Sequence, residues 1–265
     1  MLFIGTLPGG LVFVLDMLFP VLLTILLGRE VIAGRSKRNY QLVALLGVIT
    51  MLNALYHLGT MQVLPGNERL AIYLLIHSMV ILVTIIAGRI VPAFTGNWLR
   101  SQGKTDMPVN SDLINRAALW LTVVVGLAAS FMPFHSLTGV LAFVAAAVHL
   151  LRLSRWKAFA TTSNPLLFVL HAAYLWLPIG YILLGCAVFG WIFTPTAALH
   201  ALTMGAIGSM VLAVTTRVAL GHTGRPLLAS RATVLAYWVF MIAVVLRVLG
   251  PFAGSQYLLM IDLSA

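Results

Sequence analysis

Charged side chains are scarce in this sequence of 265 residues, of which only 8% are charged and 61% are apolar. An ordinary soluble domain has roughly a quarter of its residues charged. The mean hydropathy is +1.04, and neither half of the chain is polar. Nearly every segment must therefore face lipid or another buried helix. The composition excludes a soluble fold and predicts a single transmembrane helical domain over residues 1–265.

Cysteine and the familiar catalytic motifs are also lacking. The single cysteine, Cys186, excludes an internal disulfide or a cysteine-based metal cluster. The sequence has no GxGxxG or Walker-type loop, no GxSxG and no HExxH, and no pair of carboxylates inside the spans. Hydrolytic and nucleotide-dependent activities are therefore unsupported, whereas redox activity at a metal centre stays open.

Long apolar runs fill the chain instead. A helix needs about 20 mostly apolar residues to cross the roughly 30 Å hydrocarbon layer, because unpaired backbone groups are not tolerated in lipid. The sequence predicts an all-α, polytopic membrane protein with about eight transmembrane helices. The predicted spans are residues 11–28, 41–60, 70–91, 117–134, 136–153, 165–190, 196–219 and 232–250.

The basic residues gather at alternate loops. Of the 16 lysines and arginines, all except Arg69 and Arg247 lie at or after the ends of the first, third, fifth and seventh spans. In a soluble protein the net charge of +10 would suggest nucleic acid as a partner, but this alternation indicates topology, and we expect no nucleic-acid binding. The positive-inside rule places the basic loops in the cytoplasm and both termini on the opposite side.

Histidines recur inside the predicted spans, where they can stay neutral. Imidazoles at similar depths on facing helices are able to bind haem axially or to hold copper through neutral ring nitrogens. For each histidine the alternative is a hydrogen bond to a carbonyl or hydroxyl group across a helix interface. The outer half of the predicted bundle contains His57, His77, His200 and, at its edge, His135, and the inner half contains His149 and His171.

His200 and Met204 are four residues apart in the seventh span, on one face of a helix. An imidazole with a thioether is a ligand pair suited to Cu(I) or to haem iron. The alternative is a methionine that only fills an irregular gap. Small residues at every fourth position of this span also permit close approach, either of a neighbouring helix or of a flat macrocycle. They are Ala197, Ala201, Gly205, Ser209 and Ala213.

Asp16 is the only carboxylate well inside a span, and it lies toward the outer side of the first one. A charge inside a span needs a partner or a purpose. One expectation is that Asp16 pairs with Arg247. The equally supported alternative is that both side chains snorkel to the outer interface.

The segment TRVALGHTGRPL at the cytoplasmic end of the seventh span combines Arg217, His222 and Arg225 with glycines. A basic, glycine-containing turn is able to bind haem propionates or an anionic head group, because guanidinium pairs bidentately with carboxylate and phosphate. The alternative is that these charges only fix the loop on the cytoplasmic side.

Three strings of the sequence resemble the NnrS family. The most specific is HALTMGAIGSMVLAVTTRVALGHTGRPL, residues 200–227. GRIVPAFTGNWL, residues 88–99, and RLSRWKAFATTSNPLLFVLHAAYLWLPIGYILLG, residues 152–185, are similar to two other blocks of that family. The resemblance runs from about residue 15 to about residue 250. Typical members are longer, so we expect a shortened member that lacks the N-terminal spans.

The resemblance implies a haem- and copper-containing protein of the bacterial inner membrane, involved in denitrification and in nitric oxide metabolism or nitrosative-stress tolerance. Its implied partners are the lipid bilayer, haem, copper and nitric oxide. The implied metal ligands are His77, His200 and Met204. The implied cofactor-binding residues are His77, His149, His171, His200, His222, Arg89 and Arg217.

Two other functions fit the sequence. A small-solute transporter or channel would use the intramembrane histidines and arginines as a polar path. It ranks second because only Pro178 marks a helix break and no internal repeat is visible. A cofactor-free membrane subunit would instead use the small-residue stripe of the seventh span as an interface with its partner.

Overall fold

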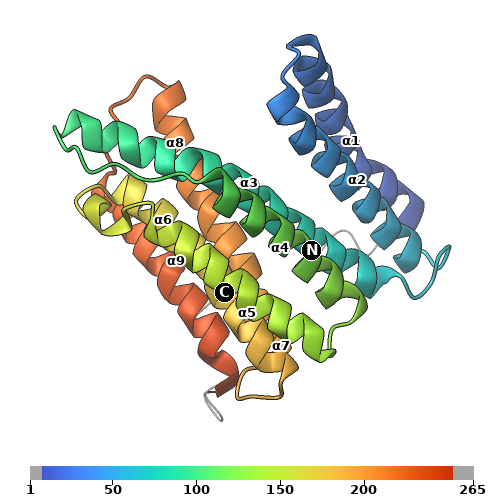
Figure 1. Cartoon of the computed structure of the whole chain (residues 1–265). Helices are drawn as coiled ribbons and strands as arrows, with labels where there is room; N and C mark the ends of the chain where they lie inside the picture. Colours follow the sequence, from blue (N-terminus) through green and yellow to red (C-terminus); the bar gives the residue numbers. More distant parts are fainter. Residues whose placement is uncertain (1–7, 253–265) are drawn as a thin grey trace. The chain divides into compact units, whose positions relative to one another are not determined.

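Helices make up most of the computed structural model, which describes residues 8–252 (Figure 1). This range contains no strand, and eight of its helices are long and apolar enough to cross a membrane. The predicted all-α, polytopic membrane fold is therefore confirmed. Many large apolar side chains lie exposed on these helices, as expected for surfaces that contact lipid.

The long helices follow the predicted order. They are α1 (Gly9–Ala33), α2 (Tyr40–Thr60), α3 (Glu68–Ser101), α4 (Asp112–Phe131), α5 (Ser136–Ser154), α6 (Pro165–Val188) and α9 (Arg231–Leu249). The seventh span consists of three consecutive pieces, α7 (Pro195–His200), the π-helical segment η4 (Ala201–Gly208) and α8 (Ser209–His222). The third helix is longer than its predicted span because it continues through Pro92 to Ser101.

Side-chain caps fix the start of two helices next to tight connections. The Thr194 hydroxyl accepts a hydrogen bond from the backbone N–H of Ala197 at the start of α7. At the short turn between α4 and α5, Nδ1 of His135 accepts a hydrogen bond of 3.1 Å from the N–H of Leu137. His135 therefore has a structural role as the cap of α5.

The chain divides into two compact units, residues 1–82 and 83–265. In the described part of the first unit, α1 and α2 lie side by side as a hairpin, drawn in blue in Figure 1. The hydroxyl oxygens of Thr24 and Thr50 are 3.1 Å apart and link the two helices. The beginning of α3 completes this unit.

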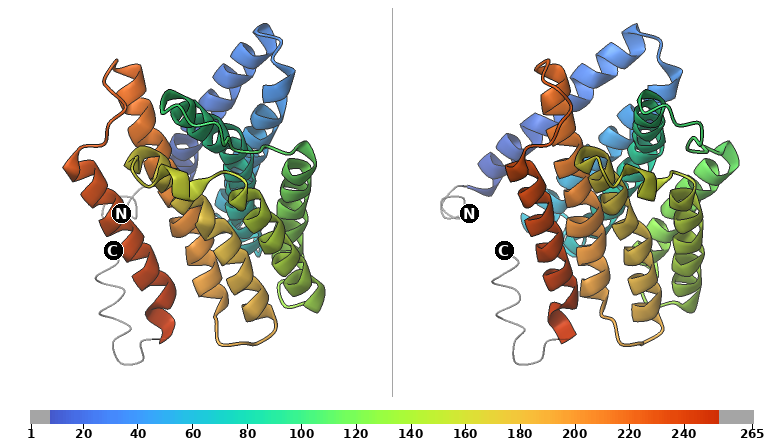
Figure 2. Two further views of the ribbon diagram at one scale, coloured as in Figure 1. Left: turned by 60° about the vertical axis from the view of Figure 1, so that its left-hand side comes forward. Right: turned by 90° about the vertical axis from the view of Figure 1, so that its left-hand side faces the viewer.

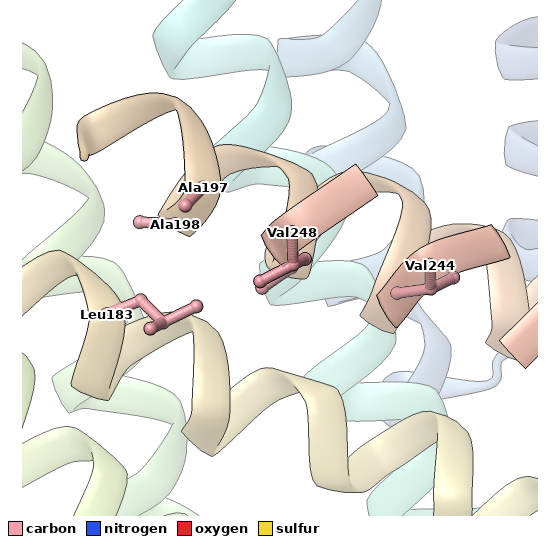
Figure 3. Packing of buried hydrophobic residues seen from close by; sticks show 6 residues of the cluster. Leu183, Ala197, Ala198, Val244 and Val248 are labelled. Atoms are coloured by element: carbon pink, nitrogen blue, oxygen red, sulfur yellow. The ribbon is translucent and has the colours of Figure 1, made fainter. Parts of the chain in front are cut away.

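In the second unit α6 is the central helix. It packs against α5 on one side and against the α7–η4–α8 rod on another, while α4 lies against α5 and α9 lies against the rod (Figure 2). The most apolar stretch of α6 is 67% buried, compared with 17% for α9. Figure 3 shows where α6, the rod and α9 meet. The buried side chains there are Leu183, Ala197, Ala198, Ala201, Val244 and Val248.

The small residues of the seventh span permit the close approach that the sequence predicted. All five of them are buried. A Cβ added at Gly205 would lie 2.8 Å from Cγ of Trp176 in α6, and one added at Gly180 would lie 2.6 Å from a methyl carbon of Leu202. At Gly205 the small-residue stripe thus packs against a neighbouring helix, α6.

Gly205→Ala should lower the unfolding temperature in detergent, because the new methyl group overlaps the half-buried side chain of Trp176. Overpacking of this kind costs about 1–3 kcal/mol. Gly47→Ala in α2 is the matched control, since a Cβ there meets no atom within 4 Å. Alanine should be neutral or stabilising at that position. Equal unfolding temperatures for the two variants would contradict the close helix contact.

Candidate functional site

Arg152 is a buried cation near the end of α5, with 5% of its surface exposed. Its Nε donates to Oδ1 of Asn115 at 2.8 Å, and its Nη1 donates to the Thr84 carbonyl and to the Tyr174 hydroxyl, both at 3.0 Å. The guanidinium carbon lies 5.1 Å from the ring centroid of Trp156. Within residues 8–252, no salt bridge involves Arg152. Neutral acceptors and aromatic faces therefore stabilise its charge.

Gly88 in α3 makes the space for this guanidinium. A Cβ at this position would overlap Nη2 of Arg152 and would lie 2.6 Å from its Cζ. Thr84 and Thr95 lie four residues before and seven residues after Gly88, so all three share one face of α3. This face carries the polar contacts of α3 with α5 and α6.

The hydrogen bonds beyond Arg152 have only one possible direction. Arginine can only donate, so the Tyr174 oxygen accepts from Arg152. The Thr122 hydroxyl gives its single hydrogen to a backbone carbonyl, so it accepts from Nε2 of His149, and Nδ1 of His149 accepts the hydrogen of Tyr174, 2.6 Å away. Nε2 of His149 then carries a hydrogen and donates to the Thr122 hydroxyl at 3.0 Å. Thr122 in turn donates to the carbonyl of Ala118 at 2.8 Å. Both ring nitrogens of His149 are thus hydrogen-bonded, and this histidine orients Tyr174 toward Arg152.

His171 differs from His149 because one of its ring nitrogens has no partner. Its Nε2 lies 3.0 Å from the hydroxyl oxygen of Thr95, and its buried Nδ1 has no hydrogen-bond partner among the described residues. A neutral imidazole with one nitrogen hydrogen-bonded and the other unoccupied is the arrangement in which histidine binds metals.

His171 also lines an apolar groove of about 480 Å³ between α5, α6 and the turn that joins them. Phe159 and Phe168 contribute aromatic rings, and Lys157 contributes a cation whose Nζ lies 2.7 Å from Oδ2 of Asp106. The complete lining is Leu150, Leu153, Ser154, Lys157, Ala158, Phe159, Ala160, Phe168, His171, Ala172 and Leu175. The groove thus combines apolar walls with one buried histidine and one basic side chain that is paired with Asp106.

Comparison with protein families matches residues 1–265 to the family described as "NnrS protein". The chain belongs to the NnrS family. The predicted resemblance is confirmed, and membership supports a membrane protein of the nitric oxide response. No curated protein and no solved structure matched the chain.

The three metal ligands implied by the NnrS resemblance belong to different parts of the fold. His77 is buried in α3 within the first unit, and its Nδ1 has no hydrogen-bond partner in the described range. His200 and Met204 are half-buried in the second unit, at the end of α7 and in η4. Met204 packs against the buried cluster of α6, the rod and α9.

The remaining residues implied for this NnrS protein have simpler surroundings. The guanidinium of Arg217 in α8 lies 4.3 Å from the ring centroid of Phe94 in α3, a cation–π contact. His222 ends α8 and is exposed. Arg89 is half-buried and follows Gly88 in α3. Of the seven implied residues, the structure brings His149 and His171 to the shared interface of α3, α5 and α6.

The π-helical segment η4 begins directly after His200 and lies within the most specific NnrS string. Short π-helical segments occur frequently at functional sites. In the described chain, however, no three His, Cys, Asp or Glu side chains come together in a way that could hold a metal ion. The histidines therefore have to be considered one by one as ligands.

In the sequence Arg152 served only as one of the basic residues that mark topology, and neither Tyr174 nor Thr122 was among the predicted site residues. A signal was present, because Arg152 lies three residues after His149 and Tyr174 lies three residues after His171. Residues three apart share a helix face. Each helix therefore presents a histidine and a second polar group on one side.

Tyr174→Phe should lower the unfolding temperature, because it removes an acceptor of Arg152 and leaves Nδ1 of His149 unpaired. A buried group left without its partner costs about 1–3 kcal/mol. Tyr181→Phe is the matched control, because that hydroxyl is equally buried and its removal leaves the hydrogen bonds of Arg152 and His149 with Tyr174 in place. Similar losses in both variants would show that the ordered hydrogen bonds do not stabilise the bundle.

Gly88→Ala should displace the guanidinium of Arg152 and destabilise the protein. In an Arg152→Met background the same change should cost less, because the clashing group is gone. We expect an interaction free energy on the order of 0.5–3 kcal/mol from the double-mutant cycle, measured by unfolding in detergent. Additive losses would contradict direct contact between the two residues.

Proposed function

We propose that this NnrS-family chain binds haem in the groove beside His171 and acts in nitric oxide metabolism or nitrosative-stress tolerance. The observation that carries the proposal is the unpartnered Nδ1 of His171, a residue that lines an apolar groove in a protein of this family. Bound haem would supply an iron centre able to bind diatomic ligands such as nitric oxide.

The residues present fit haem as a ligand of this groove. Its volume of about 480 Å³ falls in the usual range of 300–1,000 Å³ for small-molecule and cofactor sites. Haem is held in many proteins by a single proximal histidine, so a cluster of ligands is not required. Thr95 fixes the ring of His171, and Phe159 and Phe168 offer flat apolar surfaces. Lys157 also lines the groove, with its charge paired to Asp106.

His149 is assigned a positioning role in this proposal. Both of its ring nitrogens are hydrogen-bonded, to Tyr174 and to Thr122, so neither offers a lone pair to a metal. The two inner-half histidines of the sequence thus have separate tasks. His171 would hold the cofactor, and His149 would keep the Arg152 contacts in place.

Copper is the second metal that the family implies. Of the residues implied to bind it, His77 belongs to the first unit, and His200 and Met204 belong to the second. The described residues hold no larger cluster around any of them. Their assignment to copper stays a prediction, which the metal analysis below tests together with the haem.

The protein is multi-pass, and we propose that it lies in the bacterial inner membrane. Most of the basic residues lie in the loops after α1, α3, α5 and α8 or in the helix ends beside these loops. By the positive-inside rule they would face the cytoplasm. The groove beside His171 lies at the end of α5 next to Lys157, so the haem would sit toward the cytoplasmic side.

His171→Ala should remove or shift the haem absorbance of the purified protein, because it removes the proposed axial ligand. We would record oxidised and dithionite-reduced spectra and quantify haem and copper after expression with both supplied. His149→Gln is the matched control, and it should retain haem while lowering the unfolding temperature.

Two results would redirect the assignment. Haem retained in His171→Ala and lost in His200→Ala would move the site to the seventh span. A folded wild-type protein without haem would reject haem binding, and transport or a cofactor-free structural role would then take first place.

A further inference from the structure

Charged groups inside the helices differ in how completely they are partnered. The carboxylate of Asp16 in α1 takes its recorded partners from α2 rather than from Arg247. Nδ2 of Asn53 donates to Oδ2 of Asp16 at 2.6 Å, and Nε2 of His57 lies 2.9 Å from the same oxygen. Hydrogen bonds within the α1–α2 hairpin therefore explain Asp16.

Arg152, in contrast, keeps donors that have no acceptor. A guanidinium has five N–H groups. The three hydrogen bonds that Arg152 makes within residues 8–252 use Nε once and Nη1 twice. Both hydrogens of Nη2 thus lack an acceptor in this part of the chain, although only 5% of the Arg152 surface is exposed.

A second donor without an acceptor lies beside this guanidinium. Trp156 is 0% exposed, and its Nε1 has no hydrogen-bond partner among the described residues. This nitrogen belongs to the indole whose ring centroid is 5.1 Å from Cζ of Arg152. Buried polar groups without a partner are rare in folded proteins, so each one requires an explanation. Here two of them are neighbours, and both can only donate.

No negative charge from the described chain compensates Arg152. Within residues 8–252 it takes part in no salt bridge, and its acceptors are an amide, a carbonyl and a hydroxyl group. A buried ion is costly unless an opposite charge and further hydrogen bonds compensate it. A positive charge with unpartnered donors is complementary to a ligand that is negative and accepts hydrogen bonds.

We propose that Arg152 and Trp156 form a binding site for a small monovalent anion such as chloride or nitrate. The anion accepts hydrogen bonds from Nη2 of Arg152 and Nε1 of Trp156, and it compensates the guanidinium charge. Hydrogen bonds between ionised groups are roughly twice as strong as neutral ones. A water molecule could accept the same hydrogen bonds, but it would leave the charge uncompensated.

The surroundings of the two donors restrict the size of the anion. Trp156 is fully buried, and the backbone of Gly88 lies against Nη2 of Arg152. A large organic anion such as gluconate should therefore not enter. The exposed Arg155, which precedes Trp156, adds positive charge that attracts anions to this end of α5.

This site is separate from the groove proposed to bind haem. Neither Arg152 nor Trp156 is among the residues that line the groove beside His171. The proposal requires no metal and no haem. It also gives the guanidinium two functions, since Nε and Nη1 join the helices whereas Nη2 binds the ligand.

Trp156→Phe is the most direct test, because it removes the indole N–H and keeps the recorded hydrogen-bond partners of Arg152. The protein would be purified in detergent with sodium gluconate and titrated with sodium chloride or sodium nitrate at constant ionic strength. Both anions should raise the unfolding temperature of the wild type, and the concentration dependence gives the dissociation constant. We expect Trp156→Phe to bind either anion roughly tenfold more weakly.

Two exposed residues of α4 provide matched controls. Trp120→Phe makes the same change at a tryptophan that is 65% exposed, and Arg116→Gln removes an exposed arginine that follows Asn115. Both variants should retain the anion affinity of the wild type. Arg152→Lys keeps the positive charge but lacks Nη2, so it should also weaken binding, and it preserves the test if Trp156→Phe fails to fold.

Two outcomes would overturn the anion site. Unfolding temperatures that are the same in gluconate, chloride and nitrate would show that the two donors bind water only. Equal anion affinity in the wild type, Trp156→Phe and Arg152→Lys would place the anion elsewhere. His171→Ala separates this proposal from the haem proposal, because it should lose haem and retain the response to both anions.

Discussion

The arrangement of α3 to α6 depends on one buried guanidinium without a carboxylate partner in the described chain. Removing an ion from water costs several kcal/mol even after the protein relaxes, so every donor of Arg152 needs an acceptor. Those acceptors come from α3, α4 and α6. Each contact therefore sets the position of a neighbouring helix relative to α5. Burial of Arg152 also requires a glycine at position 88, because any side chain there would overlap the guanidinium.

The same constraint positions the groove proposed to bind haem. Tyr174 and His171 lie three residues apart on α6, so the helix that Arg152 holds through Tyr174 also presents His171. Thr95 on α3 then orients the His171 ring. Two histidines of similar depth thus acquire different chemistry from their neighbours. The partners of His149 occupy both of its nitrogens, whereas those of His171 leave one unoccupied.

The spans and the fold class could be predicted because lipid imposes a minimum length and apolarity on each helix. The family could be predicted because its strings are long and specific. The contacts of Asp16 with Asn53 and His57 could not, since they depend on which helices are neighbours, and the sequence placed His57 and Arg247 at a similar depth. The role of Arg152 was missed because a basic residue at a helix end also marks topology. The π-helical register of η4 has no signature in an apolar, small-residue sequence.

A hydrogen-bonded chain carries protons only when a proton can enter at one end and leave at the other. The chain through Tyr174, His149 and Thr122 begins at a guanidinium that does not release its proton. It ends at the carbonyl of Ala118, which has no proton to pass on. This chain of hydrogen bonds therefore does not conduct protons. Its members fix the positions of α3 to α6 without providing a route for protons.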